Sequence, residues 1–307
     1  MINKILHRKA VIFGIKSTKL TSAERFFFKK YKPWGIILFS RNIKSINQTK
    51  LLIENIKNLF NDYYFPILID QEGGKVSRIN KIIDFSLFSQ EFFGKLYKKN
   101  KKEFFTKYQI YNNTLCYLLK DIGININTVP VLDIKIKKSH NIIGNRSFSK
   151  DPAVVKNLGK ICIKLHSNNK IATVIKHIPG HGRAKVDSHI STPIVNVSKN
   201  TLTKSDFIPF TRNKSLFAMT AHVVFKSYDK NNVCTHSKTI ISQIIRKHIK
   251  FKGILISDDI SMKALKNNVV INGQKALQAG CNLVLHCNGN IKEMWNLAKN
   301  LPTINKF

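Results

Sequence analysis

Acidic residues are scarce in this chain. Its 307 residues contain 17 aspartates and glutamates against 52 lysines and arginines, which gives a formal net charge of +35. Such an excess suggests nucleic acid or an anionic membrane as a partner, because phosphate contacts release counterions. Only eight of the basic residues are arginine, however, and the lysines are scattered in pairs from Lys29-Lys30 to Lys137-Lys138. This scatter favours a compositional drift of the whole surface over a dedicated nucleic-acid face.

Cysteines are few, and long apolar runs are absent. The five cysteines are odd in number and form no C-x-x-C pair, so neither a disulfide framework nor a zinc site is indicated. No apolar run approaches the roughly 20 residues of a membrane span, and the run Ala10–Ile15 is too short for a signal peptide. We therefore expect a soluble cytoplasmic protein. Without a Gly/Ser-rich or Pro-rich linker, we also expect residues 1–307 to form a single domain.

Short apolar runs rich in β-branched residues alternate with segments of helical period, in which apolar residues recur at three- and four-residue steps. Eight such alternations predict parallel strands and, most economically, a closed (β/α)8 barrel. The predicted strands are Val11–Ile15, Gly35–Phe39, Ile67–Ile69, Ile124–Val131, Ile171–Ile175, Leu216–Thr220, Ile254–Ile256 and Leu283–Leu285. The predicted helices include Ser45–Phe60, Phe104–Asp121, Asp151–Asn168, Lys238–Lys250 and Gly273–Ala279.

Polar side chains stand where the apolar runs stop. In barrels of this kind the carboxyl ends of the strands carry the active site. Several of the few acidic residues fall at these ends or in the loops that follow, which favours chemistry over a solvated face. The residues at the strand ends are Ser40-Arg41, Asp70, Asp133, Lys176-His177, His222, Asp258-Asp259 and Asn288.

The segment from Lys176 to His189 carries three histidines on a loop, since one proline and two glycines within it prevent a regular helix. Asp187 stands two residues before His189, a spacing at which the carboxylate can orient an imidazole for general acid–base work. Two other interpretations stay open at this point. Several of these histidines and Asp187 together would suit a metal ion, or the histidines are unconnected.

A second segment, from Gly253 to Met262, delivers Asp258 to the mouth of the predicted barrel at the end of an apolar strand. There a carboxylate can serve as a nucleophile or a metal ligand. The alternative is that the pair Asp258-Asp259 simply caps a helix. Asp259 suits that cap better, because it stands nearer the expected helix Ser261–Leu265.

Two further segments offer polar groups. In Ile69–Arg78, Asp70 ends a strand, a Gly-Gly turn follows, and Arg78 is expected to fold back toward the mouth. A carboxylate and a planar guanidinium suit a site for hydroxyls and an amide. Arg146 precedes Asp151-Pro152, a predicted helix start, and judged alone it is as readily a surface charge.

Taken together, these segments resemble the glycoside hydrolase family 3 β-N-acetylglucosaminidases of bacterial peptidoglycan recycling. The matching motifs occur in the family's order along most of the chain. They are LFSRN (Leu38–Asn42), IDQEGGKVSRI (Ile69–Ile79), PVLDI (Pro130–Ile134), NRSFSKDP (Asn145–Pro152), KHIPGHG (Lys176–Gly182) with DSH (Asp187–His189), MTAHVVF (Met219–Phe225), SDDISM (Ser257–Met262) and ALQAGCNLVLHCN (Ala276–Asn288).

The resemblance implies a role for each matching position. It makes Asp258 the catalytic nucleophile and His189 the general acid/base, with Asp187 as its partner in a His-Asp dyad. It implies no cofactor and no metal, a monomer, and N-acetylglucosamine-containing peptidoglycan fragments, including 1,6-anhydro-muropeptides, as substrates. The sugar-binding positions that it implies are Asp70, Arg78, Arg146, Lys176 and His177.

The implied reaction removes terminal non-reducing N-acetylglucosamine through a covalent glycosyl-enzyme, with retention of configuration. A neutral imidazole repels an anionic acceptor less than a carboxylate would, so phosphate is expected to compete with water. The dyad loop is Gly-rich, and His189 is expected to reach the site only with substrate bound. Ile178 stands where the family commonly has an aromatic, and the last barrel helix is expected to be trimmed after Asn288.

Two other functions remain as alternatives. One is a metal-dependent hydrolase on the same barrel, which would lose activity on EDTA treatment. The other is a non-catalytic basic binding protein, which would bind nucleic acid in a salt-sensitive way whether or not Asp258 is present.

Overall fold

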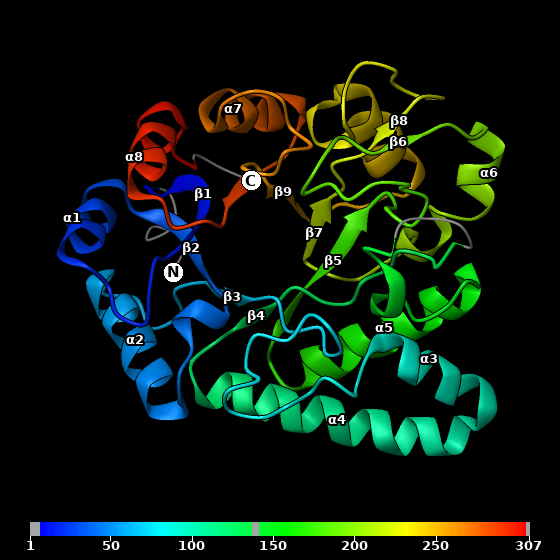
Figure 1. Ribbon diagram of the computed structural model, residues 1–307, viewed down its shortest axis with the longest axis horizontal. Helices are drawn as coiled ribbons and strands as arrows, with labels where there is room; N and C mark the ends of the chain where they lie inside the picture. The colour runs from blue at the N-terminus through cyan, green and yellow to red at the C-terminus, as the bar shows by residue number, and fades with distance from the viewer. Residues whose placement is uncertain (1–6, 137–140, 305–307) are drawn as a thin grey trace.

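Eight parallel strands close into a barrel in the computed structural model, which describes residues 7–136 and 141–304 (Figure 1). Around the barrel the strand order is β1-β10-β9-β7-β5-β4-β3-β2, so neighbours follow the chain and β10 closes onto β1. The bounds of the strands are β1 Lys9–Gly14, β2 Pro33–Leu38, β3 Ile67–Ile69, β4 Ile126–Asn127, β5 Ala172–Ile178, β7 Phe217–Thr220, β9 Ile254–Asp259 and β10 Leu283–His286.

The strands sort their apolar side chains to two sides. On β1, Ile12 belongs to a small cluster with Trp34 and Leu285, whereas Val11 and Phe13 belong to the larger core that includes helix residues. This is the two-residue alternation expected of a strand. The small cluster fills the barrel and the large one seals the strands against the helices, so all strands are buried on both faces, as parallel sheets are.

Helices surround the barrel, and the end of the chain completes the ring. The side chains of α1 (Ser22–Tyr31) and α8 (Ile291–Asn300) meet where the Tyr31 and Trp295 rings pack edge to face, with centroids 5.1 Å apart. Figure 1 shows these two helices side by side. The remaining helices are α2 Ile46–Leu59, α3 Gln90–Lys99, α4 Lys101–Asp121, α5 Pro152–Asn168, α6 Lys199–Lys204, a π-helix Ile240–His248 and α7 Val269–Ala279.

Local sequence explains where helices begin. Thr21 and Glu24 form a reciprocal capping box at the start of α1, and the Asp151 carboxylate accepts from the backbone N–H groups of Ala153 and Val154 at the start of α5. Pro152 occupies the first turn of α5, where a missing N–H costs nothing.

The barrel is confirmed, and each predicted strand overlaps one of its strands, although of the predicted Ile124–Val131 only Ile126–Asn127 is a strand. Two expectations about local structure are wrong. Ser261–Leu265 forms turns rather than a helix, and the last barrel helix is present as α8, with ten residues. The two-stranded pair β6 (Ile194–Val195) and β8 (Val224–Phe225) lies outside the barrel and was not predicted.

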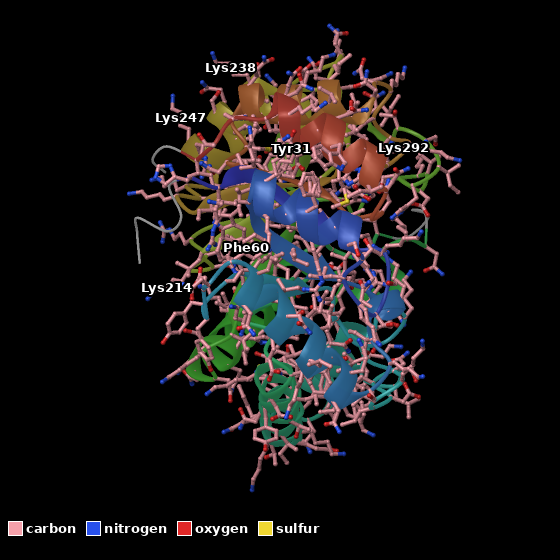
Figure 2. The ribbon with its side chains drawn as sticks, turned by 90° about the vertical axis from the view of Figure 1, so that its left-hand side faces the viewer. Tyr31, Phe60, Lys214, Lys238, Lys247 and Lys292 are labelled. Atoms are coloured by element: carbon pink, nitrogen blue, oxygen red, sulfur yellow. The ribbon has the colours of Figure 1, made fainter. Side chains whose placement is uncertain are left out.

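The surface carries its lysines on many elements. Figure 2 shows Lys238 and Lys247 near each other and Lys214 and Lys292 elsewhere on the outside of the molecule, and all four are exposed. Lys137-Lys138 lie outside the described residues. Among the residues with described structure, no helix is long and apolar enough to cross a membrane.

Candidate active site

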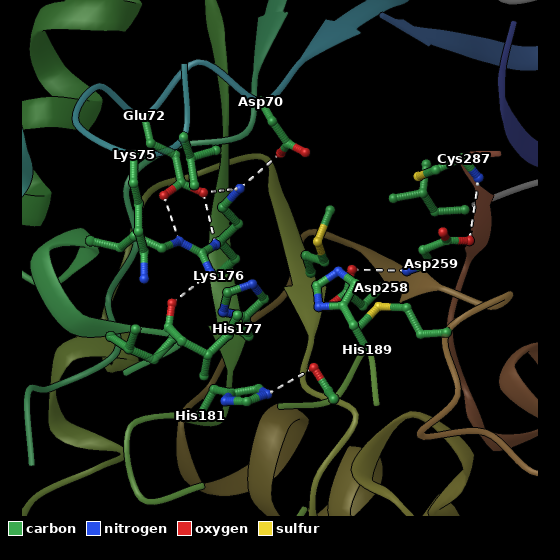
Figure 3. Close-up of a pocket in the computed structure, with 18 of the residues that line it drawn as sticks. Asp70, Glu72, Lys75, Lys176, His177, His181, His189, Asp258, Asp259 and Cys287 are labelled. Carbon is green, nitrogen blue, oxygen red and sulfur yellow. Dashed lines mark hydrogen bonds and ion pairs between the residues drawn. The ribbon is translucent and has the colours of Figure 1, made fainter. Parts of the chain in front are cut away.

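A pocket of about 340 Å³ opens at the carboxyl ends of the barrel strands (Figure 3). Seven of the eight predicted site residues line it, and the eighth, Asp187, bonds to one of them. They come from the loop after β3, the 3-10 turn Gly144–Arg146, the end of β5 and the loop after it, and the end of β9. The seven are Asp70, Arg78, Arg146, Lys176, His177, His189 and Asp258.

Lys176 is the centre of an ion-pair network on one side of the pocket. Its ammonium Nζ lies 2.8 Å from Asp70 Oδ1 and 2.7 Å from Glu72 Oε1, and its side chain is only 2% exposed. It also donates to the Thr128 hydroxyl at 2.9 Å, and that hydroxyl donates to Asp70. A buried ammonium with three donors is thus fully partnered, as a buried charge must be.

Glu72 joins this network to Arg146. The guanidinium donates from Nε to Oε2 at 2.7 Å and from a terminal nitrogen to Oε1 at 2.8 Å, a bidentate pair. Burial favours the neutral carboxyl, but Arg146 and Lys176 outweigh it and lower the pKa of Glu72 to about 2. In the same way Lys176 and Arg78 overcome burial and hold the pKa of Asp70 far below its ordinary value. Both carboxylates are ionised at neutral pH.

Arg78 extends the network toward the mouth. Its guanidinium lies 3.5 Å from Asp70 Oδ2 and sits over the Phe39 ring at 5.2 Å. The backbone N–H of Arg78 donates to Gln71 Oε1 at 2.7 Å, which fixes the loop after the Gly-Gly turn. The predicted return of Arg78 to the mouth is confirmed by its place in the pocket lining.

Asp133 orients His177, which lines the pocket. Its Nδ1 lies 2.6 Å from Asp133 Oδ2, and the backbone N–H of His181 donates to Asp133 Oδ1 at 2.6 Å. Despite burial, His177 and His181 lower the pKa of Asp133, so the carboxylate is charged and fixes the His177 ring. Asp133 and Glu72 were absent from the predicted site residues, although both stand in motifs that mark strand ends.

Asp258 lies near the end of β9 and lines the pocket. The Asp259 backbone N–H donates to Asp258 Oδ1 at 2.8 Å. Burial acts to raise the pKa of Asp258, but His222, His177, the Asp259 N–H and Lys176 lower it below its ordinary value. The carboxylate is therefore charged and available to an electrophile in the pocket.

The Asp259 carboxylate accepts a hydrogen bond within its own turn. Its Oδ1 accepts from the Ser261 backbone N–H at 3.1 Å, and the backbone C=O of Asp259 lies 3.0 Å from His222 Nε2. Asp259 thus caps a turn, as well as lining the pocket, and no helix begins at Ser261.

His189 and Asp187 lie on the loop after β5. The imidazole Nδ1 is 2.9 Å from Asp187 Oδ1, and the His189 backbone N–H donates to the same oxygen at 2.8 Å. The His189 side chain is 64% exposed and lines the same pocket as Asp258. Within residues 7–136 and 141–304, no three His, Cys, Asp or Glu side chains are grouped to hold a metal ion.

The model of the glycosyl hydrolase family 3 N-terminal domain matches residues 5–305. The chain belongs to this family. A curated β-hexosaminidase of Nitrosomonas eutropha is 32% identical over 285 residues, covering 91% of this chain and 80% of the relative. A β-hexosaminidase of Haemophilus influenzae is 33% identical over 288 residues, covering 91% and 79%.

Solved structures agree on the fold of this family 3 member. NagZ from Neisseria gonorrhoeae, in complex with N-trifluoroacetyl-D-glucosamine, is 29% identical with a TM-score of 0.86, covering 97% of this chain and 86% of the neighbour. A family 3 β-N-acetylglucosaminidase from Paenibacillus has a TM-score of 0.85 at 23% identity, covering 98% of this chain and 57% of that one. This family 3 chain is a glycosidase.

Proposed function

We propose that this glycosidase is a retaining exo-β-N-acetylglucosaminidase that releases terminal N-acetylglucosamine from peptidoglycan fragments. The observation that carries the proposal is one pocket lined by both the ionised Asp258 and the His189 of the Asp187 pair. A charged carboxylate and an oriented imidazole are a nucleophile and a proton donor, the two groups that a retaining mechanism needs. The names of the relatives and the sugar derivative bound to NagZ support N-acetylglucosamine as the sugar.

In the first step, Asp258 attacks the anomeric carbon as His189 gives its proton to the departing glycosidic oxygen. The C–O bond to the aglycone breaks and a glycosyl ester to Asp258 forms. In the second step, His189 takes a proton from water, which opens the ester from the opposite face and restores Asp258. Two inversions leave the anomeric configuration retained.

The ion-pair network supplies the sugar contacts in this proposal. Asp70 lines the pocket as an acceptor for sugar hydroxyls, and Lys176, whose three donors go to Asp70, Glu72 and Thr128, fixes that carboxylate beside the sugar. Arg78, Arg146 and His177 bound the space for the N-acetyl sugar. Their mutual ion pairs fix these groups before substrate arrives, which avoids the cost of ordering them on binding.

A lysine at the pocket mouth favours an aglycone that carries carboxylates, such as the lactyl and peptide groups of a wall fragment. Lys75 lines the mouth with an exposed side chain, and its Nζ donates to the backbone carbonyl of Asn141 at 2.6 Å. Binding to a carbonyl leaves the positive charge of the ammonium uncompensated by that partner, so a carboxylate there is attracted. We place this turnover of wall fragments in the cytoplasm. The five cysteines are unpaired, as is usual in a reducing compartment.

The test is release of 4-nitrophenol from 4-nitrophenyl N-acetyl-β-D-glucosaminide by the wild type, Asp258→Ala and His189→Ala, with and without EDTA. We expect wild-type activity that survives EDTA and collapses in Asp258→Ala. Loss on EDTA treatment would instead favour the metal-dependent hydrolase. A folded wild type that releases nothing from this substrate or from anhydro-muropeptides, yet binds nucleic acid in a salt-sensitive way, would favour the basic binding protein.

A further inference from the structure

Ser188 is buried between two residues that are not. It is 3% exposed, whereas the His189 side chain beside it is 64% exposed and the Asp187 side chain is 18% exposed. A small polar residue buried inside an exposed loop marks the point where the loop is attached. The contacts of Ser188 therefore bear on where the His189 imidazole lies.

One attachment runs through the side chain of Ser188 to the end of β5. Its hydroxyl Oγ lies 3.3 Å from Nε2 of His181, which is 2% exposed (Figure 3). The His181 backbone N–H in turn donates to Asp133, the carboxylate that orients His177. The ring that holds Ser188 is thus fixed to the same buried aspartate as the sugar-binding histidine.

The chain next to His181 packs closely against the backbone that follows β4. A Cβ on Gly182 would lie 2.1 Å from the backbone oxygen of Ile134, so the loop packs directly on the chain that follows β4. Burial, with His177 nearby, lowers the pKa of His181 to about 4, so the ring is neutral under ordinary assay conditions. A change in the pH dependence of activity near neutrality would then not come from His181 itself.

The second attachment runs through the backbone of Ser188 to the chain that follows the nucleophile. Its carbonyl accepts from the Ala264 N–H at 3.0 Å, and the Thr192 hydroxyl donates to the Ala264 carbonyl at 2.7 Å. Ala264 belongs to the turns that follow Asp258 and Asp259. The two attachments join the His189 loop both to the sugar-binding side and to the nucleophile side of the pocket.

We propose that Ser188 and His181 are positioning residues that set the distance of His189 from the glycosidic oxygen. This inference rests on the proposed role of His189 as the general acid/base. Ser188 and His181 both line the pocket, and the Ser188 hydroxyl lies 3.3 Å from the His181 ring, so the role assigned to the hydroxyl is to hold the loop that carries His189. A displacement of about 1 Å in a catalytic group is worth on the order of 10²-fold in rate.

The test compares leaving groups. Proton donation matters for a poor leaving group such as phenol and little for 2,4-dinitrophenol, whose oxygen departs without it. For Ser188→Ala we expect kcat/KM to fall roughly 10- to 100-fold with phenyl N-acetyl-β-D-glucosaminide and less than about threefold with the dinitrophenyl glycoside. Ser188→Thr keeps a hydroxyl and should recover most of the loss. His181→Gln should behave as Ser188→Ala does.

The matched control is Ser191→Ala, an exposed serine of the same loop, which should leave both substrates unaffected. An equal fall of kcat/KM for both leaving groups in Ser188→Ala, or no fall for either, would overturn the positioning role. If His181→Gln fails to fold, the serine variants carry the test alone.

His189→Ala is measured in parallel, so that the two proposals are distinguished. If His189→Ala depends steeply on the leaving group and Ser188→Ala does not, only the positioning role is lost. If His189→Ala itself shows no such dependence, the acid/base assignment of His189 is wrong, and the positioning role falls with it.

Discussion

The two sides of the pocket are built by opposite means. On one side, Lys176, Glu72, Asp70 and Arg146 are joined by ion pairs, and the Lys176 and Glu72 side chains are 2% and 1% exposed. On the other side, His189 stands 64% exposed on a loop and has one carboxylate partner, Asp187. The first side is fixed by ion pairs between charges that are mostly buried. The loop of the second side is attached through the contact of the Ser188 hydroxyl with His181 and through the backbone hydrogen bond from Ala264 to Ser188.

Under the proposed function, the buried side binds the sugar and the loop side transfers the proton. Recognition of a sugar gains from groups held rigid before binding, whereas a group that both gives and takes a proton must also face the departing aglycone and the incoming water. The comparison predicts that mutations on the buried side cost stability and activity together, and that mutations on the loop side cost activity alone.

The largest effect is expected for Lys176→Met. Removal of the ammonium takes the shared partner from Glu72, whose side chain is 1% exposed, and from Asp70, whose side chain is 17% exposed. Breaking a buried pair typically costs about 3–5 kcal/mol of unfolding free energy. We expect that loss in urea unfolding, together with loss of measurable activity. Lys164→Met, an exposed lysine of α5, is the control. A Lys176→Met protein as stable as the control would show that the buried side is not held by these ion pairs.

His189→Ala should lower the rate about 10²- to 10⁴-fold, the usual contribution of a general acid/base. Its melting temperature should match the wild type, because the side chain is 64% exposed. Thermal unfolding and phenyl glycoside hydrolysis measured on one preparation check both halves of the statement. A large drop in melting temperature would show that the loop side, like the buried side, contributes to stability, and would contradict the comparison.

Acid should lower the stability of the folded protein. Burial lowers the pKa of His166, behind the network, to about 4, so the folded protein keeps this ring neutral. Unfolded chains protonate histidine near pH 6.5, and stability is therefore present above that pH and lost as pH falls from about 6.5 toward 4. His166→Gln should flatten this slope by up to about 1.4 kcal/mol per pH unit. An unchanged slope in urea unfolding across pH 4 to 7 would refute the neutral ring.

Lys75→Gln should raise KM about two- to fivefold for an aglycone with carboxylates and leave the nitrophenyl glycoside unchanged, because exposed ion pairs are worth about 0.2–1 kcal/mol. The effect should shrink at high salt. Lys81→Gln, exposed on the same loop, is the control. A rise in KM for both substrates would place Lys75 at the sugar rather than at the aglycone.

The smallest effect concerns the acceptor. With a neutral imidazole as base, phosphate is expected to compete with water for the glycosyl-enzyme, which yields N-acetylglucosamine 1-phosphate as a minor product. Chromatography of products formed in phosphate buffer, against a buffer without phosphate, checks this. Free sugar as the sole product in both would remove the idea.

The sequence alone predicted the barrel and placed most of the site. The strands are recognisable because each is a short apolar run that ends in a polar residue, and parallel packing brings those ends together. Asp133 and Glu72 were missed as site residues because their part is to fix His177 and Lys176, a relation that depends on distances of 2.6 and 2.7 Å across different loops. The turns at Ser261–Leu265 were mistaken for a helix because Asp259 caps either one equally well.

The central claim is that Asp258 forms a covalent bond to the sugar. The most direct measurement is mass spectrometry after incubation with a 5-fluoro N-acetylglucosaminyl fluoride. Its anomeric fluoride departs readily as Asp258 attacks the anomeric carbon, so the glycosyl ester forms, while the 5-fluoro substituent slows hydrolysis of that ester. We predict one added sugar per chain, located on the peptide that contains Asp258 and absent in Asp258→Ala. Turnover of the reagent with no label, or a label on another residue, would contradict the account.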